Sequence, residues 1–423
     1  MSANTPPPAA GSSSARAPLT PLAVALAELL TFATPLNTLE TVCTFDADGR
    51  VLAQDLVAAL DVPAHDNSGM DGYAVRASDW LNASTPLPVS QRIAAGHSGT
   101  ALAANSVARI FTGAPVPAGA DAVVMQEDCT AAASSAGVAV CMAAAPRPGQ
   151  WIRRRAEDVA SGTVVLARGA RLGPAALGLA ASIGFAELTV AAPVRVALFS
   201  TGDELVMPGD VLPQDMAPGA VYNSNRFFLR ALLQRLGCKV TDMGIVPDQL
   251  DATIAALETA SRQHDVILTS GGVSVGEEDH IKPAVRALGA LRLWQIAIKP
   301  GKPFAYGAAG RAHFIGLPGN PVSSFITFVL LVRPFILKLQ GAVAVAVPSI
   351  AARADFDWPS ADKRREFLRV RHNAAGGLDL FENQSSGVLT SAVWGDGLLD
   401  NPPGQTIARG DTVQFIAFAA LLS

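Results

Sequence analysis

The sequence is poor in cysteine and in charged residues, and each shortage argues against a class of protein: metal-binding or redox cysteine proteins in the first case, nucleic-acid-binding proteins in the second. Only four cysteines occur among 423 residues, and their scattered positions show neither zinc-binding nor redox spacing. A chain of this length does not need disulfides, so we expect reduced thiols and a cytoplasmic location. Charged residues make up 16% of the chain and the net charge is −4, so no clustered basic face for nucleic acid is expected.

No stretch has the pattern of a signal peptide or a membrane span. The start, MSANTPPPAAGSSSARAP, is of low complexity, so we expect residues 1–18 to form a disordered tail. The most apolar run, FITFVLLVRPFILKL, is interrupted by Arg333 and Pro334, which predicts a buried helix rather than a membrane span. Hydrophobic residues make up 50% of the chain, enough for several cores.

Changes of composition along the chain predict a multidomain α/β and β protein. Residues 19–56 and 146–190 hold short helical patterns and are expected to pack together as one discontinuous, elongated domain. Residues 57–145 are rich in Gly, Pro, Val and Thr, which predicts a β-rich domain. Residues 191–340 form the predicted α/β domain, and residues 341–423 return to a β pattern.

Strand and helix patterns alternate within the α/β region, which predicts a doubly wound parallel sheet. Ligands of such sheets bind beyond the carboxyl ends of the strands. Five unusual loops follow predicted strands: STGDEL, VPDQ, SGGVSVGEED, KPGKP and LPGNPVS. We therefore expect these loops to form one cleft at one edge of the sheet.

The segment TSGGVSVGEED has the glycine spacing of a phosphate-binding P-loop but lacks its lysine. Glycines let the backbone approach a ligand closely, and exposed N–H groups with serine hydroxyls can cradle an anion. The residues of this loop that would bind a phosphate are Ser270, Gly271, Gly272, Ser274 and Gly276.

The same loop ends in acids, which suggests an indirect way to bind phosphate. Asp279 could hold Mg²⁺, an ion that favours carboxylates together with substrate phosphates. Thr201 and Glu204 in STGDEL, or Asp248 in VPDQ, are either turn residues or further ligands near Asp279. A simpler alternative is that Glu277, Glu278 and Asp279 only stabilise a helix N-terminus.

Two other loops indicate a second anion site. IKPGKP places Lys299 and Lys302 on either side of a Pro-Gly turn, where their charges repel unless an anion lies between them; a solvated turn is the alternative. In LPGNPVSSF, Asn320 suits an N-cap, which would leave N–H groups near Val322 and Ser323 for an anion. An ordinary capped helix explains this second pattern about as well.

Taken together, seven motifs resemble the molybdopterin molybdenumtransferase family (MoeA type), to which the gephyrin E domain also belongs. They are DNSGMDGYAV, FTGAPVPAGADAVVMQED, RRRAED, STGDEL, SGGVSVGEED, IKPGKP and GLPGNPVS. The resemblance runs in order from about Pro21 to the C-terminus. It implies molybdate insertion into adenylylated molybdopterin with Mg²⁺-dependent release of AMP, in an elongated homodimer whose active site is shared between subunits.

The resemblance also implies a role for individual residues. The proposed pterin-phosphate pocket comprises Thr201, Glu204, Ser270, Gly271, Gly272, Ser274 and Gly276. Asp248 and Asp279 would hold Mg²⁺ or polarise the pyrophosphate. The implied molybdate ligands are Lys299, Lys302, Ser323, Arg369 and, more weakly, Ser386. The partner subunit would contribute its copies of Asp71, Thr112, Arg155 and Asp158.

Two positions depart from the family pattern, and two other functions stay open. Many members carry Asp at Asn223, so this chain lacks that charge, and some carry Lys at Gln295, so its anion pocket is expected to hold less positive charge. The protein could instead adenylylate molybdopterin, or act as a non-catalytic molybdopterin-binding scaffold. Partners implied by the resemblance are a molybdopterin adenylyltransferase and recipient molybdoenzymes, with neither nucleic acid nor membrane.

Overall fold

The structure is a computed structural model that describes residues 18–134, 137–273 and 280–422. Its contacts divide the chain into two units. One unit comprises the described residues within 18–40, 49–51 and 191–422, and the other comprises those within 41–48 and 52–190. Each unit is described here by itself.

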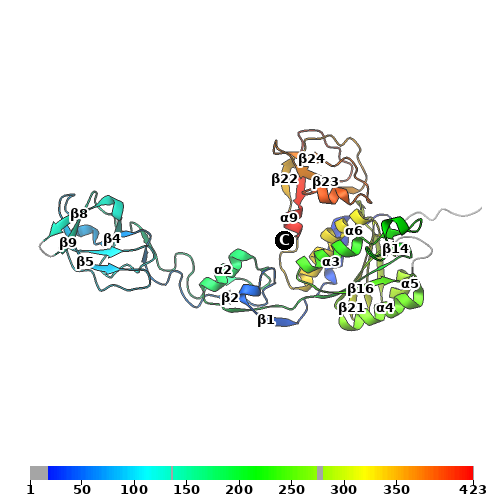
Figure 1. The fold of residues 1–423 in the computed structure, drawn as a ribbon, viewed down its shortest axis with the longest axis horizontal. Coiled ribbons are helices and arrows are strands. Elements are labelled where there is room, and N and C mark those ends of the chain that lie inside the picture. Colours follow the sequence, from blue (N-terminus) through cyan, green and yellow to red (C-terminus); the bar gives the residue numbers. More distant parts are fainter. Residues whose placement is uncertain (1–17, 135–136, 274–279, 423) are drawn as a thin grey trace, which may run out of the picture. The chain divides into compact units, whose positions relative to one another are not determined.

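The first unit is built around a six-stranded sheet (Figure 1). In spatial order its strands are β16 (Lys239–Val246), β13 (Arg195–Thr201), β17 (Val266–Ser270), β21 (Ala312–Leu317), β20 (Pro303–Ala309) and β18 (Leu291–Gln295). The first four are parallel, as predicted, but β20 runs antiparallel to both of its neighbours. The reason is local: only Gly310 and Arg311 separate β20 from β21, and so short a turn joins antiparallel strands only.

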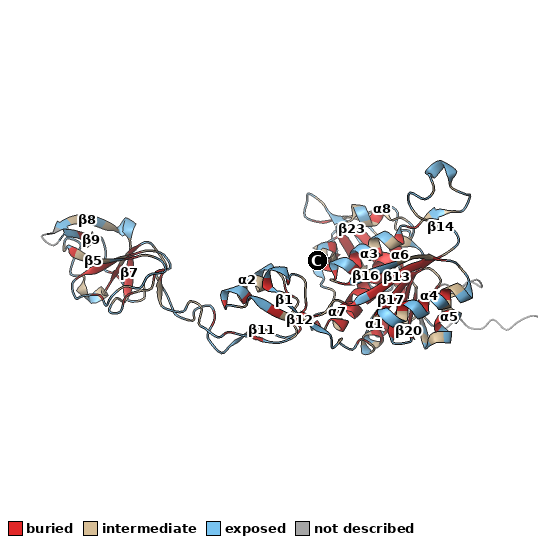
Figure 2. Ribbon diagram, turned by 60° about the horizontal axis from the view of Figure 1, so that its bottom comes forward, coloured by how far each residue is buried: buried red, intermediate tan, exposed pale blue. Residues whose placement is uncertain are grey.

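Helices cover both faces of this sheet, which confirms the doubly wound prediction. Successive residues of β13 point to opposite faces, so Val196 and Leu198 enter one core while Ala197 and Phe199 enter the other. Figure 2 shows the buried strands β13 and β17 between helices with exposed outer surfaces. The helices are α3 (Asn225–Arg235), α6 (Pro321–Thr327) and α7 (Arg333–Leu339) on one face, and α4 (Leu250–Gln263) and α5 (Ile281–Leu288) on the other.

The most apolar run forms one long helical segment. A π-helical turn, η5 (Phe328–Val332), joins α6 to α7 just before Pro334, which has no N–H to donate. Among the described residues, Pro321–Leu339 is the one helix whose length and hydropathy suit a membrane span, but 94% of its apolar window is buried in the structure. The expectation of a buried core helix is therefore confirmed.

Helix α1 (Leu22–Thr31) packs on the α/β core and not with the elongated domain expected from the sequence. Ala25 and Leu29 are buried in the same core as α7. The carboxylate of Glu28 accepts hydrogen bonds from Arg292 Nη1 at 3.0 Å and Trp294 Nε1 at 3.2 Å. Helix α1 is therefore held in place by residues more than 260 positions later along the chain.

The second unit contains two bodies. One joins segments far apart in sequence, since β1 (Leu39–Cys43) pairs with β12 (Glu187–Ala191) and β2 (Leu56–Val57) pairs with β11 (Val164–Leu166). Its core of Leu52, Leu56, Leu172, Leu188 and Val190 is capped by η1 (Thr44–Asp46) and α2 (Pro174–Ser182).

The other body is a six-stranded β sheet with an apolar core on each face. Its strands in spatial order are β7 (Ala122–Met125), β4 (Gly72–Val75), β6 (Val107–Ile110), β5 (Leu87–Ile93), β9 (Gly137–Met142) and β8 (Cys129–Ser134). Short elements complete it: β3 (Asn67–Ser68), β10 (Ile152–Arg153), η2 (Ala77–Asp79) and η3 (Gln126–Asp128).

The C-terminal region forms a second sheet in the first unit. Its strands are β19 (Ile298–Lys299), β23 (Arg365–His372), β25 (Gly397–Asn401), β26 (Thr412–Ala417) and β22 (Ile350–Arg353), with β24 (Leu378–Leu380) beside β23. Because β19 lies between β18 and β20 in the chain, the IKPGKP segment connects the two sheets. Helix α8 (Thr390–Trp394) packs near β23, and α9 (Phe418–Leu422) enters the α/β core through Phe418 and Leu421.

Candidate active site

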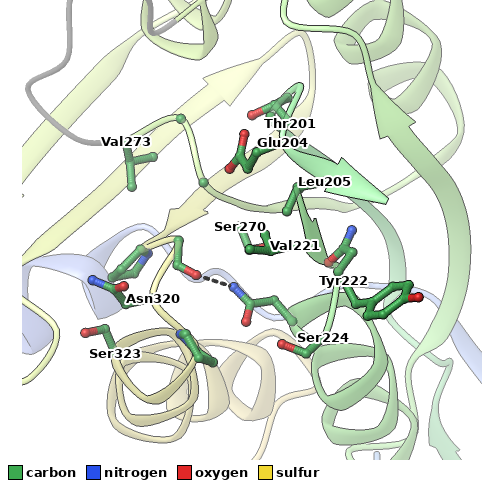
Figure 3. A pocket seen from close by; sticks show the side chains of 18 of the residues that line it. Thr201, Glu204, Leu205, Val221, Tyr222, Ser224, Ser270, Val273, Asn320 and Ser323 are labelled. Atoms are coloured by element: carbon green, nitrogen blue, oxygen red, sulfur yellow. Dashed lines mark hydrogen bonds between the residues drawn. The ribbon is translucent and has the colours of Figure 1, made fainter. Parts of the chain in front are cut away.

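A cavity of about 740 Å³ lies at the carboxyl ends of the parallel strands (Figure 3). The loops after β13, β16, β17 and β21 all contribute to it, and KPGKP contributes Pro303, so the five unusual loops meet, as the sequence predicted. Figure 3 shows Thr201 and Glu204 on one side, Asn320 and Ser323 on another, and Ser270 between them. The predicted site residues that line this cavity are Thr201, Glu204, Asp248, Ser270, Gly271, Gly272 and Ser323.

The double-glycine turn after β17 requires glycine at both positions. Gly271 has φ 94° and Gly272 has φ 66°, a left-handed conformation that other residues rarely adopt. A Cβ on Gly272 would lie 2.5 Å from Ile281 Cγ1, and one on Gly271 would lie 3.0 Å from the carbonyl oxygen of Thr201. The backbone therefore passes close to the loop after β13, with both glycines on the cavity wall.

We expect Gly272→Ala to destabilise the protein by more than about 1 kcal/mol, since it adds both backbone strain and a clash. The matched control is Gly178→Ala, inside α2, where an added Cβ meets nothing within 4 Å. That change should stabilise the helix by roughly 0.5–1 kcal/mol. Thermal unfolding of both variants measures the difference. Equal stability of the two would show that the turn tolerates a side chain.

Two asparagines at the start of α3 form the opposite wall. Asn225 Nδ2 donates to the carbonyl oxygen of Gly319 at 2.7 Å and so fixes the LPGN loop. Asn223 is 2% exposed, and its Nδ2 has no hydrogen-bond partner within the described part of the chain. A buried amide without an acceptor is costly, and this one belongs to a cavity-lining residue. The sequence marked Asn223 only as a departure from a family pattern; the unsatisfied donor makes it a candidate ligand group.

A short arm closes one side of the cavity. It consists of β14 (Leu205–Val206) and β15 (Val221–Tyr222), with η4 (Pro213–Asp215) between them. Tyr222 Oη donates to the carbonyl oxygen of Val211 at 2.6 Å, which holds the arm together. Leu205, Val221 and Tyr222 line the cavity and supply its apolar surface.

The cavity also carries carboxylates. Glu204 and Asp248 line it, and the backbone N–H of Asp248 faces Asp203 Oδ1 at 3.4 Å. Within the described residues, no three His, Cys, Asp or Glu side chains gather as a metal-binding group. The predicted site residues Ser274, Gly276 and Asp279, together with Glu277 and Glu278, lie outside the described residues.

The start of α6 differs from the prediction in one respect. The N–H of Val322 donates to the carbonyl oxygen of Ser386 at 3.0 Å and is therefore not available to an anion. A C-terminal segment more than sixty residues later satisfies a donor that the sequence pattern left open. Ser323 itself lines the cavity, as predicted.

The two lysines of IKPGKP do not face a common cavity. Lys299 Nζ contacts Glu366 Oε1 at 3.0 Å and Asp362 Oδ2 at 3.3 Å. Burial acts to lower the pKa of Lys299, but the hydrogen bonds and charges of these carboxylates outweigh it and raise the pKa above its ordinary value. The anion beside Lys299 is therefore a pair of the protein's own carboxylates.

Lys302 lines a second cavity of about 870 Å³ near the start of α1. The lining includes three further basic residues, Lys363, Arg364 and Arg365, and one acid, Asp362. Arg364 is held by Asp362, and Arg365 is held by Asp400. Lys302 and Ser323 thus line different cavities, although Pro303, the residue after Lys302, lines the first cavity with Ser323.

Arg369 is buried within the C-terminal domain and lines neither cavity. It is 1% exposed, and its guanidinium donates to Ser391 Oγ at 3.0 Å and to the carbonyl oxygens of Phe367 and Ser385. Burial lowers its pKa to about 10. These bonds hold the segment that includes Ser386, so the structure gives Arg369 a positioning role there.

The remaining predicted residues lie in the second unit. Asp71 Oδ1 accepts hydrogen bonds from the N–H and the hydroxyl of Thr112, both at 2.8 Å, and these bonds lower the pKa of Asp71. The side chain of Arg155 forms an ion pair with Asp61, and the backbone N–H of Arg155 donates to Asp66 Oδ1 at 2.8 Å. Asp158 is exposed, and its N–H donates to the carbonyl oxygen of Val62.

Three family models together match most of the chain. The MoeA N-terminal region (domain I and II) matches residues 20–184, a probable molybdopterin binding domain matches residues 197–338, and the MoeA C-terminal region (domain IV) matches residues 351–418. Their order along the chain is the order of the motifs identified in the sequence.

Similar proteins agree with these matches. Molybdopterin molybdenumtransferase of Haemophilus influenzae is 44% identical over 77% of this chain and 79% of its own length. Molybdopterin molybdenumtransferase 2 of Mycobacterium tuberculosis is 37% identical over 88% of this chain and 94% of its own. The crystal structure of a molybdopterin biosynthesis MoeA protein from Pyrococcus horikoshii superposes with a TM-score of 0.81 at 28% identity, over 95% of this chain and 100% of that one. The chain therefore belongs to the molybdopterin molybdenumtransferase family, the MoeA-type transferases of molybdenum cofactor biosynthesis.

Proposed function

We propose that this protein inserts molybdenum, supplied as molybdate, into adenylylated molybdopterin and releases AMP in a Mg²⁺-dependent step. One observation carries the proposal. A single cavity at the sheet edge brings together a double-glycine turn, two carboxylates and an unsatisfied buried amide. Such a cavity suits a phosphorylated polar substrate, because glycine-turn N–H groups bind phosphate and side-chain amides orient polar rings.

The carboxylates of the cavity fit Mg²⁺. This ion takes oxygen ligands and is usually held by one or two carboxylates together with substrate phosphates. Asp248 and Glu204 supply such oxygens to the cavity wall. Release of AMP is a hydrolysis: water adds to one phosphorus of the pyrophosphate, the bridging phosphorus–oxygen bond breaks, and AMP leaves with the bridging oxygen or the added one. When bound, Mg²⁺ would neutralise the charge on the pyrophosphate. The chain's own part is to hold the phosphates against the turn at Gly271 and Gly272 and to keep the pterin against the polar wall at Asn223.

For molybdate, the support is the cationic character of the neighbouring cavity. Lys302 and Lys363 line it beside two arginines, and a divalent oxyanion is favoured where several cationic donors converge. Lys299, held by Glu366 and Asp362, fixes the turn that carries Lys302. Ser323 lines the first cavity and Arg369 lines neither, so we propose that they contribute to molybdate binding indirectly, Ser323 from the wall of the first cavity and Arg369 by ordering the segment that contains Ser386.

We also infer a homodimer in which each active site takes residues from both subunits. The second unit exposes large apolar side chains, above all Phe45 at 94%, with Val57, Leu60 and Val164 each above 40%. Val57 and Val164 are paired across β2 and β11 and so form one apolar patch, and exposed apolar patches favour a protein interface. The Asp71–Thr112 pair is exposed and preformed, as expected of a group offered to a partner. A cytoplasmic location and transient contact with a molybdopterin adenylyltransferase and recipient molybdoenzymes are part of the same proposal.

Incubation of the purified protein with adenylylated molybdopterin, molybdate and Mg²⁺ tests the function. We expect AMP in the chromatogram and a cofactor that activates an apo-molybdoenzyme. EDTA should stop AMP release, and added Mg²⁺ should restore it. Absence of both products would reject the proposal, whereas transfer of AMP from ATP to molybdopterin would identify an adenylyltransferase instead.

A further inference from the structure

The protein uses one edge of the buried Asn223 amide and leaves the other edge without a partner. Asn223 is 2% exposed and lies just before α3, in the wall of the first cavity. Its backbone N–H donates to the carbonyl oxygen of Val206 at 2.9 Å, and its Oδ1 accepts the backbone N–H of Arg226 at 3.3 Å. Because an N–H group needs an oxygen to accept it, the second bond orients the amide with Oδ1 toward the helix. The group left over is therefore Nδ2, a donor.

The Nδ2 group of Asn223 needs a hydrogen-bond acceptor that the described residues do not supply. Buried polar groups are nearly always paired, and an unpaired donor is costly. A molecule in the cavity can supply the acceptor, because Asn223 lines it. Water can do so in the empty cavity, so a ligand that displaces the water must bring an acceptor of its own. A ligand N–H at this place would leave both donors unpaired.

The wall that contains this amide is uncharged. It is made by the start of α3 and the LPGN loop, which are joined by the hydrogen bond from Asn225 to the carbonyl oxygen of Gly319. Every residue that these two segments contribute to the cavity is neutral, including Ser224 and Asn320, which Figure 3 labels. The cavity's carboxylates lie on other loops, and the double-glycine turn supplies the N–H groups for phosphate. A neutral wall with one unpaired donor suits an uncharged heterocycle that carries an acceptor.

We propose that Asn223 Nδ2 donates a hydrogen bond to the exocyclic carbonyl oxygen of the substrate's pterin ring and so selects this ring against amino analogues. The identification of the ring as a pterin rests on the proposed function, to which the contact adds a specificity-determining residue. On the pyrimidine edge of a pterin the carbonyl oxygen is an acceptor, whereas the amino group and the N–H between them are donors. An amino group in place of the carbonyl would meet Nδ2 donor to donor.

Binding of two phosphorylated pteridines to the full-length protein tests the contact by calorimetric titration. One is hydroxymethylpterin phosphate, and the other is its analogue with an amino group in place of the ring carbonyl. The phosphate is the same in both, so the ratio of their dissociation constants reports on the ring. We expect the wild type to bind the pterin about tenfold more tightly, the effect of leaving one buried donor unpaired.

Asn223→Asp should shift this ratio toward the amino analogue by about tenfold or more, because it keeps the size of the side chain and replaces the donor with an acceptor. Asn223→Leu removes the donor without adding an acceptor, so the two pteridines should bind it almost equally. Thermal unfolding checks that both variants are folded. The same ratio in the wild type and in both variants would overturn the contact.

The matched control for the added charge is Asn320→Asp. Asn320 is exposed, lines the same wall, and makes no side-chain cap bond at the start of α6. This change should weaken both phosphorylated pteridines by a similar factor and leave their ratio as in the wild type. A ratio that shifts as much in Asn320→Asp as in Asn223→Asp would reveal a general charge effect and overturn the assignment.

The result is independent of turnover. If the wild type prefers the pterin but releases no AMP from adenylylated molybdopterin, the contact stands and the proposed reaction fails. If the wild type releases AMP while the Asn223 variants keep its ratio, the reaction stands and the role of Asn223 is overturned. Binding of neither pteridine to the wild type would also overturn it, because the ring and its phosphate are the parts of the substrate assigned to this cavity.

Discussion

Replacing Asp248 with asparagine is expected to slow AMP release by at least about a hundredfold, the usual effect of removing one preorganised electrostatic group from an active site. The change keeps the size of the side chain and removes its charge from a wall that we propose binds Mg²⁺ and pyrophosphate. Part of the loss should be recovered at high Mg²⁺ concentration, because a weaker site needs more of the ion to fill. AMP release measured over a range of Mg²⁺ concentrations gives both quantities.

The matched control for this variant is Asp251→Asn, three residues further along the chain. Asp251 lies in the first turn of α4, is exposed and does not line the cavity. Its loss should cost at most about 1 kcal/mol of stability, the contribution of an acid to a helix N-terminus, and leave AMP release near the wild-type rate. If Asp248→Asn and Asp251→Asn behaved alike, the carboxylate of Asp248 would have no part in the reaction.

Mixed dimers are expected to recover activity that neither parent variant has. Asp71→Asn weakens the pair with Thr112 in the second unit, and Asp248→Asn affects the cavity of the first unit. If each active site takes Asp71 from one subunit and Asp248 from the other, a heterodimer of the two variants contains one site with both changes and one with neither. Heterodimers purified through two different affinity tags should therefore show about half of the wild-type activity.

The control for mixing is a heterodimer of Asp248→Asn with the double variant Asp71→Asn, Asp248→Asn. Every site in that dimer lacks Asp248, so it should remain as inactive as the Asp248→Asn homodimer. A site complete within one subunit would also leave the first heterodimer inactive, because each of its chains carries one change. Recovery in the first heterodimer alone is thus the result that supports a shared site.

The sequence by itself determined the architecture and the main cavity. Alternating strand and helix patterns predicted the doubly wound domain, and the parallel strands bring their carboxyl ends to one edge wherever such a sheet forms. The loops that carry Thr201, Asp248, Gly271 and Ser323 were therefore predictable neighbours. Gly271 and Gly272 were also recognisable, because a left-handed turn beside another backbone leaves few alternatives to glycine.

The tertiary structure alone decided which polar groups are already satisfied. The sequence suggested that Lys299 is available to bind an anion. In the structure β19 pairs with β23 of the C-terminal sheet, and Lys299 therefore lies beside Glu366 and Asp362. The donor of Val322 is used by Ser386, and α1 packs on the α/β core. A local sequence pattern reflects only the secondary-structure propensity and the chemistry of residues that are close along the chain. Hydrogen-bond and charge partners that are far apart along the chain depend on how the folded segments pack.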